Sequence, residues 1–123
     1  LASIVTKEVK NQADQKLVAS VFYNRLEAGM NLGSDVTFQY AYKMGMCNTN
    51  SPDCTSTYNT RNNPGLPPGP IANPSLSAML AVAEPPASGY YYFVAGEDGK
   101  TYFSETADQH NQAVADHCGK LCK

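Results

Sequence analysis

The sequence has no block of positive charge. Its formal net charge is −2 at pH 7, with 9 Lys and Arg against 11 Asp and Glu. The basic surface expected of a nucleic-acid-binding protein is therefore missing. No apolar run approaches the roughly 18 residues needed to span a bilayer. At 123 residues, with no repeat and no dividing linker, the chain is expected to form one domain, 1–123, with a real hydrophobic core.

The cysteine spacing does not favour a metal site. The four cysteines fall into two close pairs, Cys47 with Cys54 and Cys118 with Cys122, and neither has the Cys-x-x-Cys spacing typical of zinc sites. Both histidines lie near Cys118, so a metal is not excluded, but two short-loop disulfides fit better. Disulfides indicate an extracytoplasmic compartment. No metal and no cofactor is expected.

Hydrophobic periodicity and turn residues predict an α-rich α+β domain with a small β-hairpin. Helices are expected over 1–10, 14–28 and 36–44, from Asn73 as cap and Pro74 as first helical residue to Pro85, and from Thr106 to His117. Strands at 90–95 and 100–103 flank the turn Gly96-Glu97-Asp98-Gly99. A polar loop is expected over 45–63.

Glu8 stands out on the first predicted helix. At 100° per residue, Leu1, Ile4, Val5 and Val9 share one side of this helix, and Glu8 falls in its middle. A partly desolvated carboxyl has a raised pKa and keeps its proton near neutral pH, as a general acid must. The alternative is a helix-end glutamate that turns to solvent or pairs with a base.

The second predicted helix carries a charge on its apolar stripe. The stripe consists of Leu17, Val18, Val21, Phe22 and Leu26. Arg25 points along its centre and needs a carboxylate or carbonyl groups to satisfy its donors. Asp35, which follows the turn at Gly29, is a candidate partner. We therefore expect Arg25 to brace a site rather than to act in it.

A stiff segment lies between Pro64 and Pro74, where five of the eight prolines occur. Because proline fixes φ and lacks the backbone donor, the segment cannot be a helix interior or a central strand. The polar triplet Tyr58-Asn59-Thr60 precedes it. A rigid apolar wall beside polar groups suits a groove for an extended polar polymer, whereas the alternative is a rigid turn between two helices. The residues expected beside the Glu8 carboxyl are Tyr58, Asn59, Pro67, Pro68 and Asn73.

Several segments, in order, resemble a known family. They are Leu-Ala-Ser-Ile-Val-x-Lys-Glu at 1–8, Val-Ala-Ser-Val-Phe-Tyr-Asn-Arg-Leu at 18–26, Gly-Met-x-Leu-x-Ser-Asp at 29–35, Tyr-Asn-Thr at 58–60, Gly-Leu-Pro-Pro-Gly-Pro-Ile-Ala-Asn-Pro at 65–74, Tyr-Tyr-Phe-Val-Ala at 91–95, Thr-Tyr-Phe-Ser at 101–104 and His-Asn at 110–111. The chain is similar to the catalytic domain of the endolytic murein transglycosylases, the MltG or YceG-like family. The resemblance extends to about residue 114.

The resemblance implies a lysozyme-like α+β catalytic domain that acts on peptidoglycan glycan strands at the extracytoplasmic face of the bacterial cell membrane. It also implies peptidoglycan synthases as partners. Members of the family carry a membrane anchor and a LysM-like part before this domain. Since this sequence begins at Leu1 inside a helical pattern, without an initiator methionine or signal peptide, we expect it to be a fragment of such a protein.

The mechanism that the resemblance implies needs one carboxyl group, Glu8. It protonates the glycosidic oxygen between N-acetylmuramic acid and N-acetylglucosamine, and then takes the proton of the C6 hydroxyl, which closes a 1,6-anhydro ring. Groups expected to stabilise the oxocarbenium-like state are Tyr58, Asn59 and Asn73. Further candidates for substrate contacts are Asp35, Ser104, His110 and Asn111. Two alternatives stay open: a muramidase with Asp35 as second carboxylate, and a non-catalytic glycan-binding module.

Overall fold

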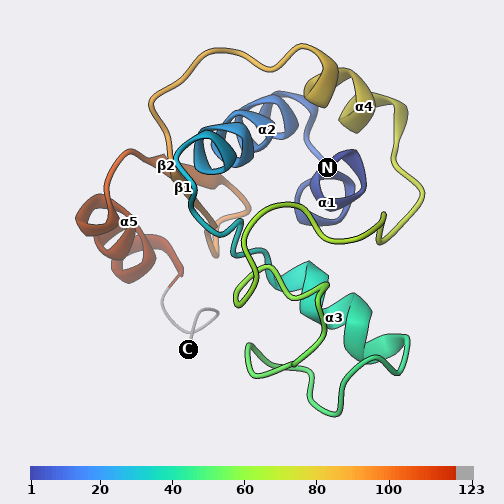
Figure 1. Cartoon of the computed structure of the whole chain (residues 1–123). Coiled ribbons are helices and arrows are strands. Elements are labelled where there is room, and N and C mark those ends of the chain that lie inside the picture. The colour runs from blue at the N-terminus through green and yellow to red at the C-terminus, as the bar shows by residue number, and fades with distance from the viewer. Residues whose placement is uncertain (119–123) are drawn as a thin grey trace.

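Helices surround a single pair of antiparallel strands in the computed structural model, which describes residues 1–118 (Figure 1). The elements are α1 Ala2–Glu8, α2 Gln12–Glu27, α3 Asp35–Lys43, α4 Leu76–Ala83, β1 Tyr92–Ala95, β2 Thr101–Ser104, α5 Ala107–Ala113 and the π-helical turn η1 Val114–Cys118. The mixed α+β class expected from the sequence is confirmed. No helix in the described part of the chain is long and apolar enough to cross a membrane.

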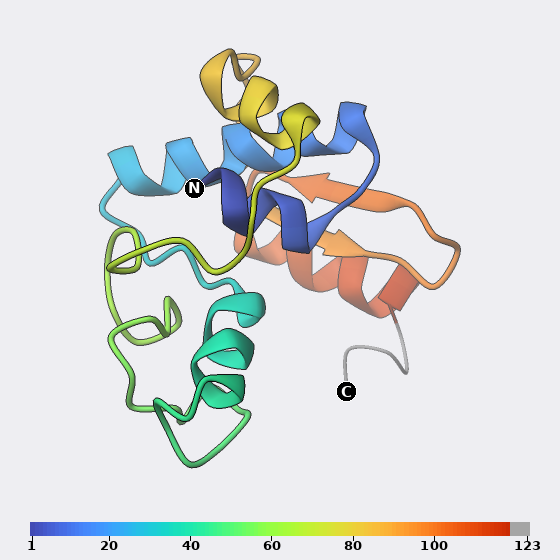
Figure 2. The ribbon, with the colours of Figure 1, turned by 90° about the vertical axis from the view of Figure 1, so that its right-hand side faces the viewer.

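The core lies between α1, α2 and α4, and α2 packs on the hairpin with its other side (Figure 2). Its buried side chains are Ile4, Val5, Val18, Ala19, Phe22, Leu32, Ile71, Ala78 and Ala81. The Phe22 ring meets the Phe93 ring edge-on at 5.7 Å, which joins α2 to β1. Helix α3 and the long loop after it form a separate lower part in this view, with a small cluster of their own around Phe38 and Cys54. The main core therefore holds the last turn of α1 close to both α2 and the hairpin.

The strands pair in the register expected of a short hairpin. Tyr92 lies opposite Ser104 and Ala95 opposite Thr101. The turn is closed by a backbone hydrogen bond from Gly96 to Lys100 of 2.7 Å. Gly99 has φ +80°, a conformation that L side chains rarely adopt. The predicted hairpin is therefore confirmed, with strand ends that shift by one or two residues.

Helix α1 is tied to the end of the proline-rich segment by two hydroxyl groups. Ser3 Oγ accepts a hydrogen bond from the Ile71 amide at 3.1 Å, and Thr6 Oγ1 accepts one from the Ser75 amide at 3.0 Å. The segment crosses beside α1 in both ribbon views (Figures 1 and 2). These bonds satisfy amides that a strand or helix would otherwise satisfy, and they fix α1 against a part of the chain distant in sequence.

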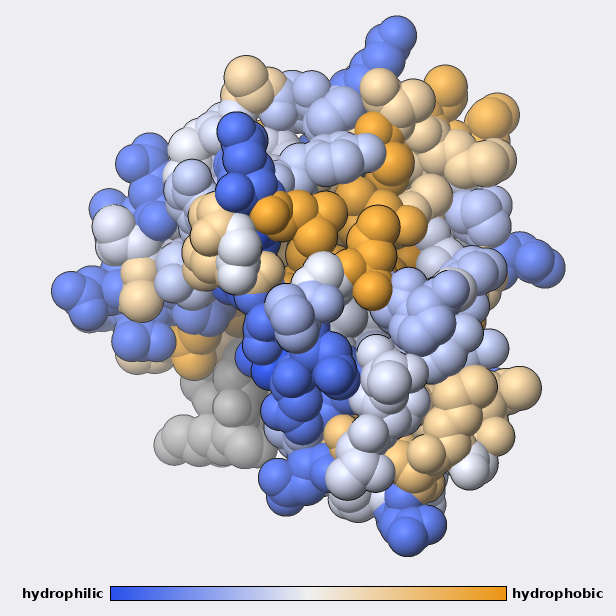
Figure 3. Space-filling model, viewed as in Figure 1, coloured by the Kyte–Doolittle hydropathy of each residue, from blue (hydrophilic) through white to orange (hydrophobic). Residues whose placement is uncertain are grey.

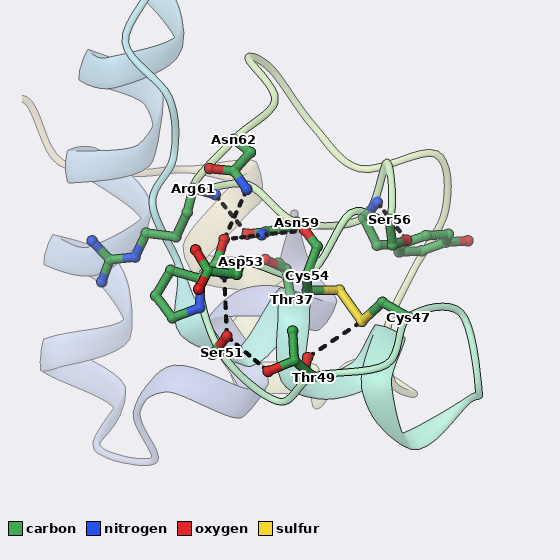
Figure 4. Close-up of a disulfide and its surroundings, with 12 residues drawn as sticks. Thr37, Cys47, Thr49, Ser51, Asp53, Cys54, Ser56, Asn59, Arg61 and Asn62 are labelled. Atoms are coloured by element: carbon green, nitrogen blue, oxygen red, sulfur yellow. Dashed lines mark hydrogen bonds between the residues drawn. A yellow bond between two sulfur atoms is a disulfide. The ribbon is translucent and has the colours of Figure 1, made fainter.

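The disulfide loop is built as its spacing predicted. Cys47 and Cys54 are bonded, with an S–S distance of 2.09 Å and a Cα–Cα distance of 5.5 Å (Figure 4). This confirms the first expected pair. The second, Cys118 with Cys122, involves a residue that lies outside the described residues.

Two helix boundaries next to Glu8 differ from the sequence expectation. Helix α1 ends at Glu8 instead of Lys10 because Val9 is extended, and the Val9 carbonyl accepts the Gln15 side chain at 3.0 Å. Helix α2 starts at Gln12, two residues early, because the Asn11 side chain accepts the Asp14 amide and caps it. Glu8 is therefore the last helical residue of α1, with no further helical turn to cover it.

Helix α4 begins two residues later than predicted. The expected cap Asn73 is exposed, and Ser75 is the cap instead because its Oγ accepts the Ala78 amide at 3.1 Å. Pro74 is therefore not the first helical residue. The end before Pro85 agrees with the prediction, since α4 stops at Ala83.

The last predicted helix changes its winding. Thr106 caps α5 by accepting the Gln109 amide, as expected. The helix does not run unchanged to His117, because residues 114–118 form a π-helical turn. There the His117 ring stacks on the Tyr102 ring with centroids 3.6 Å apart.

Apolar and polar surface separate on the molecule. In the view of Figure 3, hydrophobic side chains gather around α1 and over α4, where Leu76 is 70% and Leu80 59% exposed. Hydrophilic residues cover the lower centre of the same view.

Candidate active site

Glu8 lines a cavity of about 740 Å³ between α1, α2, the hairpin and α5. Its walls are completed by Leu32, Gly33 and Asp35 and by two residues of the long loop, Pro52 and Arg61. The titratable groups that line it are Glu8, Arg25, Asp35, Arg61 and His110. The glutamate selected by its position on the helix thus shares a cavity with four other titratable side chains.

The Glu8 carboxyl has a pKa of about 7, well above its ordinary value of 4.5. Burial is the largest cause, and the negative charge of Asp35 adds to it. The Arg61 charge and the Ser34 hydroxyl act in the opposite direction. At neutral pH a substantial share of the molecules therefore carries a proton on Glu8, available for donation into the cavity.

The Ser34 hydroxyl is buried beside this carboxyl. Ser34 Oγ makes no hydrogen bond of standard geometry with the described residues, yet it is near enough to Glu8 to oppose the rise of the pKa. A buried hydroxyl without a bonded partner is unusual and costs free energy. We interpret Ser34 as a donor that can turn to the ionised form of Glu8.

A network of hydroxyl groups holds the segment that carries Ser34. Thr60 Oγ1 accepts the Ser34 amide at 2.9 Å and lies 2.9 Å from Thr37 Oγ1, while the Thr60 carbonyl accepts the Gly33 amide at 3.1 Å. All of these groups except Gly33 are buried. The third residue of the predicted polar triplet therefore positions the cavity wall without facing the cavity.

Asp35 and Arg61 form an ion pair on this wall. Arg61 Nε donates to Asp35 Oδ1 at 2.8 Å, and the two side chains are 47% and 49% exposed. In Figure 4 the Arg61 side chain extends away from the disulfide and toward α2. Exposed pairs contribute little to folding stability, so the effect of this pair on the Glu8 pKa is its more important consequence.

Arg25 braces the site, as expected, but not through Asp35. Its Nε donates to the Tyr91 carbonyl at 2.6 Å and its Nη1 to the carbonyls of Asn31 and Leu32 at 3.0 and 3.2 Å. Its guanidinium carbon lies 4.9 Å from the centre of the Tyr92 ring. The predicted carboxylate partner was wrong because Asp35 pairs with Arg61 and the turn supplies carbonyls directly.

His110 reaches the cavity from α5. Its ring stacks on Tyr92 with centroids 5.2 Å apart. Burial lowers the pKa of His110 from 6.5, and the charges of Arg25 and Arg61 lower it further. His110 is therefore neutral at pH 7, and its buried Nδ1 has no hydrogen-bond partner among the described residues.

The structure brings Asp35 and His110 to Glu8, but not the proline-rich wall. Pro67 lines a different hollow with the first turn of α1, residues 1–4, and Pro68 and Asn73 do not line the Glu8 cavity. The expected position of Pro67, Pro68 and Asn73 is therefore wrong. The reason is that the segment follows the side of α1 that carries Ser3 and Thr6, which are bonded to Ile71 and Ser75, whereas at 100° per residue Glu8 points about 140–160° away from that side.

The remaining predicted residues have other neighbours. Asn59 is 0% exposed and donates to the carbonyls of Pro52 and Cys54, so it holds the loop and does not face Glu8 (Figure 4). Tyr58 packs on Tyr40 and touches the proline-rich segment. Ser104 is buried in β2, and Asn111 is exposed outside the cavity lining. Among Tyr90, Tyr91 and Tyr92, only the last packs on site residues.

Sequence reasoning missed Arg61, Ser34 and Gly33. Arg61 directly follows the Tyr-Asn-Thr triplet, so its place in the chain was a usable signal. Nothing in the sequence indicated that it would reach Asp35. Residues 1–118 contain no group of three or more His, Cys, Asp or Glu that could hold a metal ion.

The cavity on this α+β domain holds a carboxyl group whose pKa is raised, Glu8, and a second carboxylate that is paired to an arginine. Such an arrangement can give and take a proton. Residues 1–116 match the YceG-like family. The chain therefore belongs to the YceG-like family.

Similar proteins include two curated relatives and one solved structure. The endolytic murein transglycosylase of Bacillus subtilis is 40% identical over 115 residues, which cover 92% of this chain and 32% of the relative. The endolytic murein transglycosylase of Streptococcus pneumoniae serotype 2 is 38% identical over 125 residues, which cover 95% of this chain and 23% of the relative. A YceG-like protein from Listeria monocytogenes has a TM-score of 0.82 at 45% identity, covering 90% of this chain and 37% of that one. The chain spans a third or less of the curated relatives.

Proposed function

We propose that this domain is the catalytic part of an endolytic lytic transglycosylase. It cleaves the β-1,4 bond between N-acetylmuramic acid and N-acetylglucosamine in peptidoglycan strands and leaves 1,6-anhydro ends. The observation that carries the proposal is the Glu8 carboxyl, with a pKa of about 7, at the cavity wall. Two relatives named endolytic murein transglycosylases support it.

The chemistry follows from one group that both gives and takes a proton. Protonated Glu8 donates to the glycosidic oxygen as the bond to C1 breaks. The Glu8 carboxylate then accepts the proton of the muramoyl C6 hydroxyl, whose oxygen attacks C1. The Ser34 hydroxyl can donate to the carboxylate between these steps. No water takes part in the reaction. The proton that Glu8 loses to the leaving oxygen is replaced by the proton from the C6 hydroxyl, so Glu8 ends in its starting form.

A hydrolytic muramidase is the second candidate, because Asp35 lines the same cavity. Such an enzyme needs a second carboxylate to act as nucleophile or to activate water. The ion pair with Arg61 occupies one Asp35 oxygen, which favours the transglycosylase. A non-catalytic glycan-binding module would have no use for a carboxyl held near neutral pKa.

We also propose that the domain works at the extracytoplasmic face of the bacterial cell membrane, in a longer anchored protein that cooperates with peptidoglycan synthases. The Cys47–Cys54 disulfide supports an oxidising compartment. The chain covers 32% and 23% of the two relatives, which supports the proposal that it is part of a longer protein.

The test is mass spectrometry of muropeptides after digestion of glycan strands by the full-length protein. Products should be lighter by one water than reducing ends. Glu8→Gln keeps the size of the side chain but cannot exchange the proton, so cleavage should fall by about 10⁴. Glu27→Gln, an exposed glutamate at the end of α2, is the matched control and should keep full activity. Products with reducing ends would instead favour the muramidase. The absence of any cleavage product would favour the binding module.

A further inference from the structure

Two guanidinium groups lie beside one another at Gly33. A Cβ built on Gly33 would lie 3.1 Å from Arg25 Nη1 and 3.8 Å from Arg61 Nη1, and Gly33 has φ +66°. Both arginines line the Glu8 cavity. The missing side chain at Gly33 leaves the space in which the two guanidinium groups approach each other.

These two charges are not balanced inside the cavity. Asp35 pairs with Arg61 through a single bond to Nε, and no ion pair to Arg25 occurs among residues 1–118. Glu8 carries a proton in much of the population near pH 7, and His110 is neutral. In the molecules whose Glu8 is protonated, the two arginines therefore face a single carboxylate, that of Asp35.

The arginines still have donors to offer. Arg25 uses Nε and Nη1 for carbonyls, and Arg61 uses Nε for Asp35, but neither Nη2 group nor Arg61 Nη1 has a bonded partner among the described residues. Burial lowers the pKa of Arg25, the electrostatic interaction with the Tyr92 hydroxyl group opposes this, and the Arg61 charge lowers the pKa further. An anion placed between the guanidinium groups would relieve this repulsion.

We propose that Arg25 and Arg61, the arginine pair, bind a carboxylate that the glycan strand carries next to the cleaved bond. The inference rests on the proposed function, because it concerns the substrate of the same cavity. Sugar hydroxyl and acetamide groups are neutral. The carboxylates of peptidoglycan are those of the peptide stem and, once the stem is removed, that of the lactyl group. Arg61 is the specificity-determining residue, since its side chain is about half exposed and its two Nη groups stay available to a carboxylate while Nε is bonded to Asp35.

The experiment measures binding without cleavage, in full-length protein that carries Glu8→Gln. Three probes are titrated: glycan strands with peptide stems, strands whose stems were removed by an amidase so that the lactyl carboxylate is free, and chito-oligosaccharides, which have neither. Adding Arg61→Gln should weaken binding of at least one carboxylate-bearing strand about five- to tenfold. Binding of chito-oligosaccharides should not change. The loss should shrink at high salt.

Two further variants control for charge and for folding. Arg61→Lys keeps the charge without the fork of donors and should recover part of the affinity. Lys100→Gln removes one exposed positive charge from the hairpin turn, outside the cavity lining, and should have no effect. Near-UV circular dichroism of Arg61→Gln should match that of the parent protein.

The outcomes separate two questions. A loss confined to stem-bearing strands assigns the carboxylate to the stem, and a loss confined to amidase-treated strands assigns it to the lactyl group. Equal losses on all three probes, or no loss on any, overturn the inference. The proposed function is judged separately by the anhydro products of the unmodified protein, so either can fail while the other stands.

Discussion

Replacing Glu8 by Gln should stabilise the folded protein at alkaline pH, and the effect can be worked from the structure. Burial and Asp35 raise the pKa of Glu8 from 4.5 to about 7. Between these values the folded protein holds a proton at Glu8 that the unfolded chain has lost. Unfolding is therefore increasingly favoured as the pH rises through this window. At about 1.36 kcal/mol per pKa unit, the loss reaches about 3 kcal/mol above pH 7.

Glu8→Gln removes this loss because its amide does not ionise. Urea unfolding of both proteins at pH 4, 6 and 8, followed by far-UV circular dichroism, measures the difference in free energy of unfolding. Between pH 4 and pH 8, the free energy of unfolding of the variant should rise by about 3 kcal/mol relative to that of the parent. Titrating groups far from Glu8 are common to both proteins and cancel in the comparison, so the difference reports Glu8 together with the groups that its charge affects.

The control is Glu27→Gln, which makes the same chemical change at an exposed position outside the cavity and shows what that change does by itself. A difference between Glu8→Gln and the parent that stays constant from pH 4 to pH 8 would refute the raised pKa. The proposed acid would then be ionised at neutral pH, and its catalytic role would fail with it.

Two other measurements test the surroundings of Glu8 and the disulfide. Asp35→Asn should lower the pKa of Glu8 and move the alkaline limb of the kcat/KM profile to lower pH, whereas Arg61→Gln should move it to higher pH; shifts in the same direction would contradict the assigned charges. Reducing Cys47–Cys54, which closes a short loop with a sequence separation of 7, should cost about 2 kcal/mol by urea unfolding and leave the α1–α2 core folded. Loss of the whole fold would contradict that.

The sequence predicted the features that depend on neighbours along the chain. Glu8 was found because side chains three and four residues apart share a helix face. The Cys47–Cys54 bond followed from spacing, and the hairpin from its glycine turn. The positions of helix ends depended on which of two nearby residues formed the better cap, as with Ser75 and Asn73, so they shifted by two residues.

The parts that could not be predicted depend on contacts between distant segments. The stiffness of the proline-rich segment is local, but its place beside the first turn of α1 is fixed by Ser3 and Ile71, which lie 68 residues apart. The partner of Arg25 was equally uncertain, because the sequence does not show that carbonyls of the following turn come within its reach.

The bonds that fix α1 also set the order in which the active site can be completed during synthesis. A helix of seven residues is not stable in isolation. Its contacts at Ile71 and Ser75 form only when the chain has been made to that point, 68 and 69 residues after their partners. Before that point the chain cannot bury Glu8 as the folded domain does, so the largest cause of its raised pKa is missing. The proposed acid therefore becomes competent late, and a chain that ends before residue 71 lacks both bonds that fix the helix carrying it.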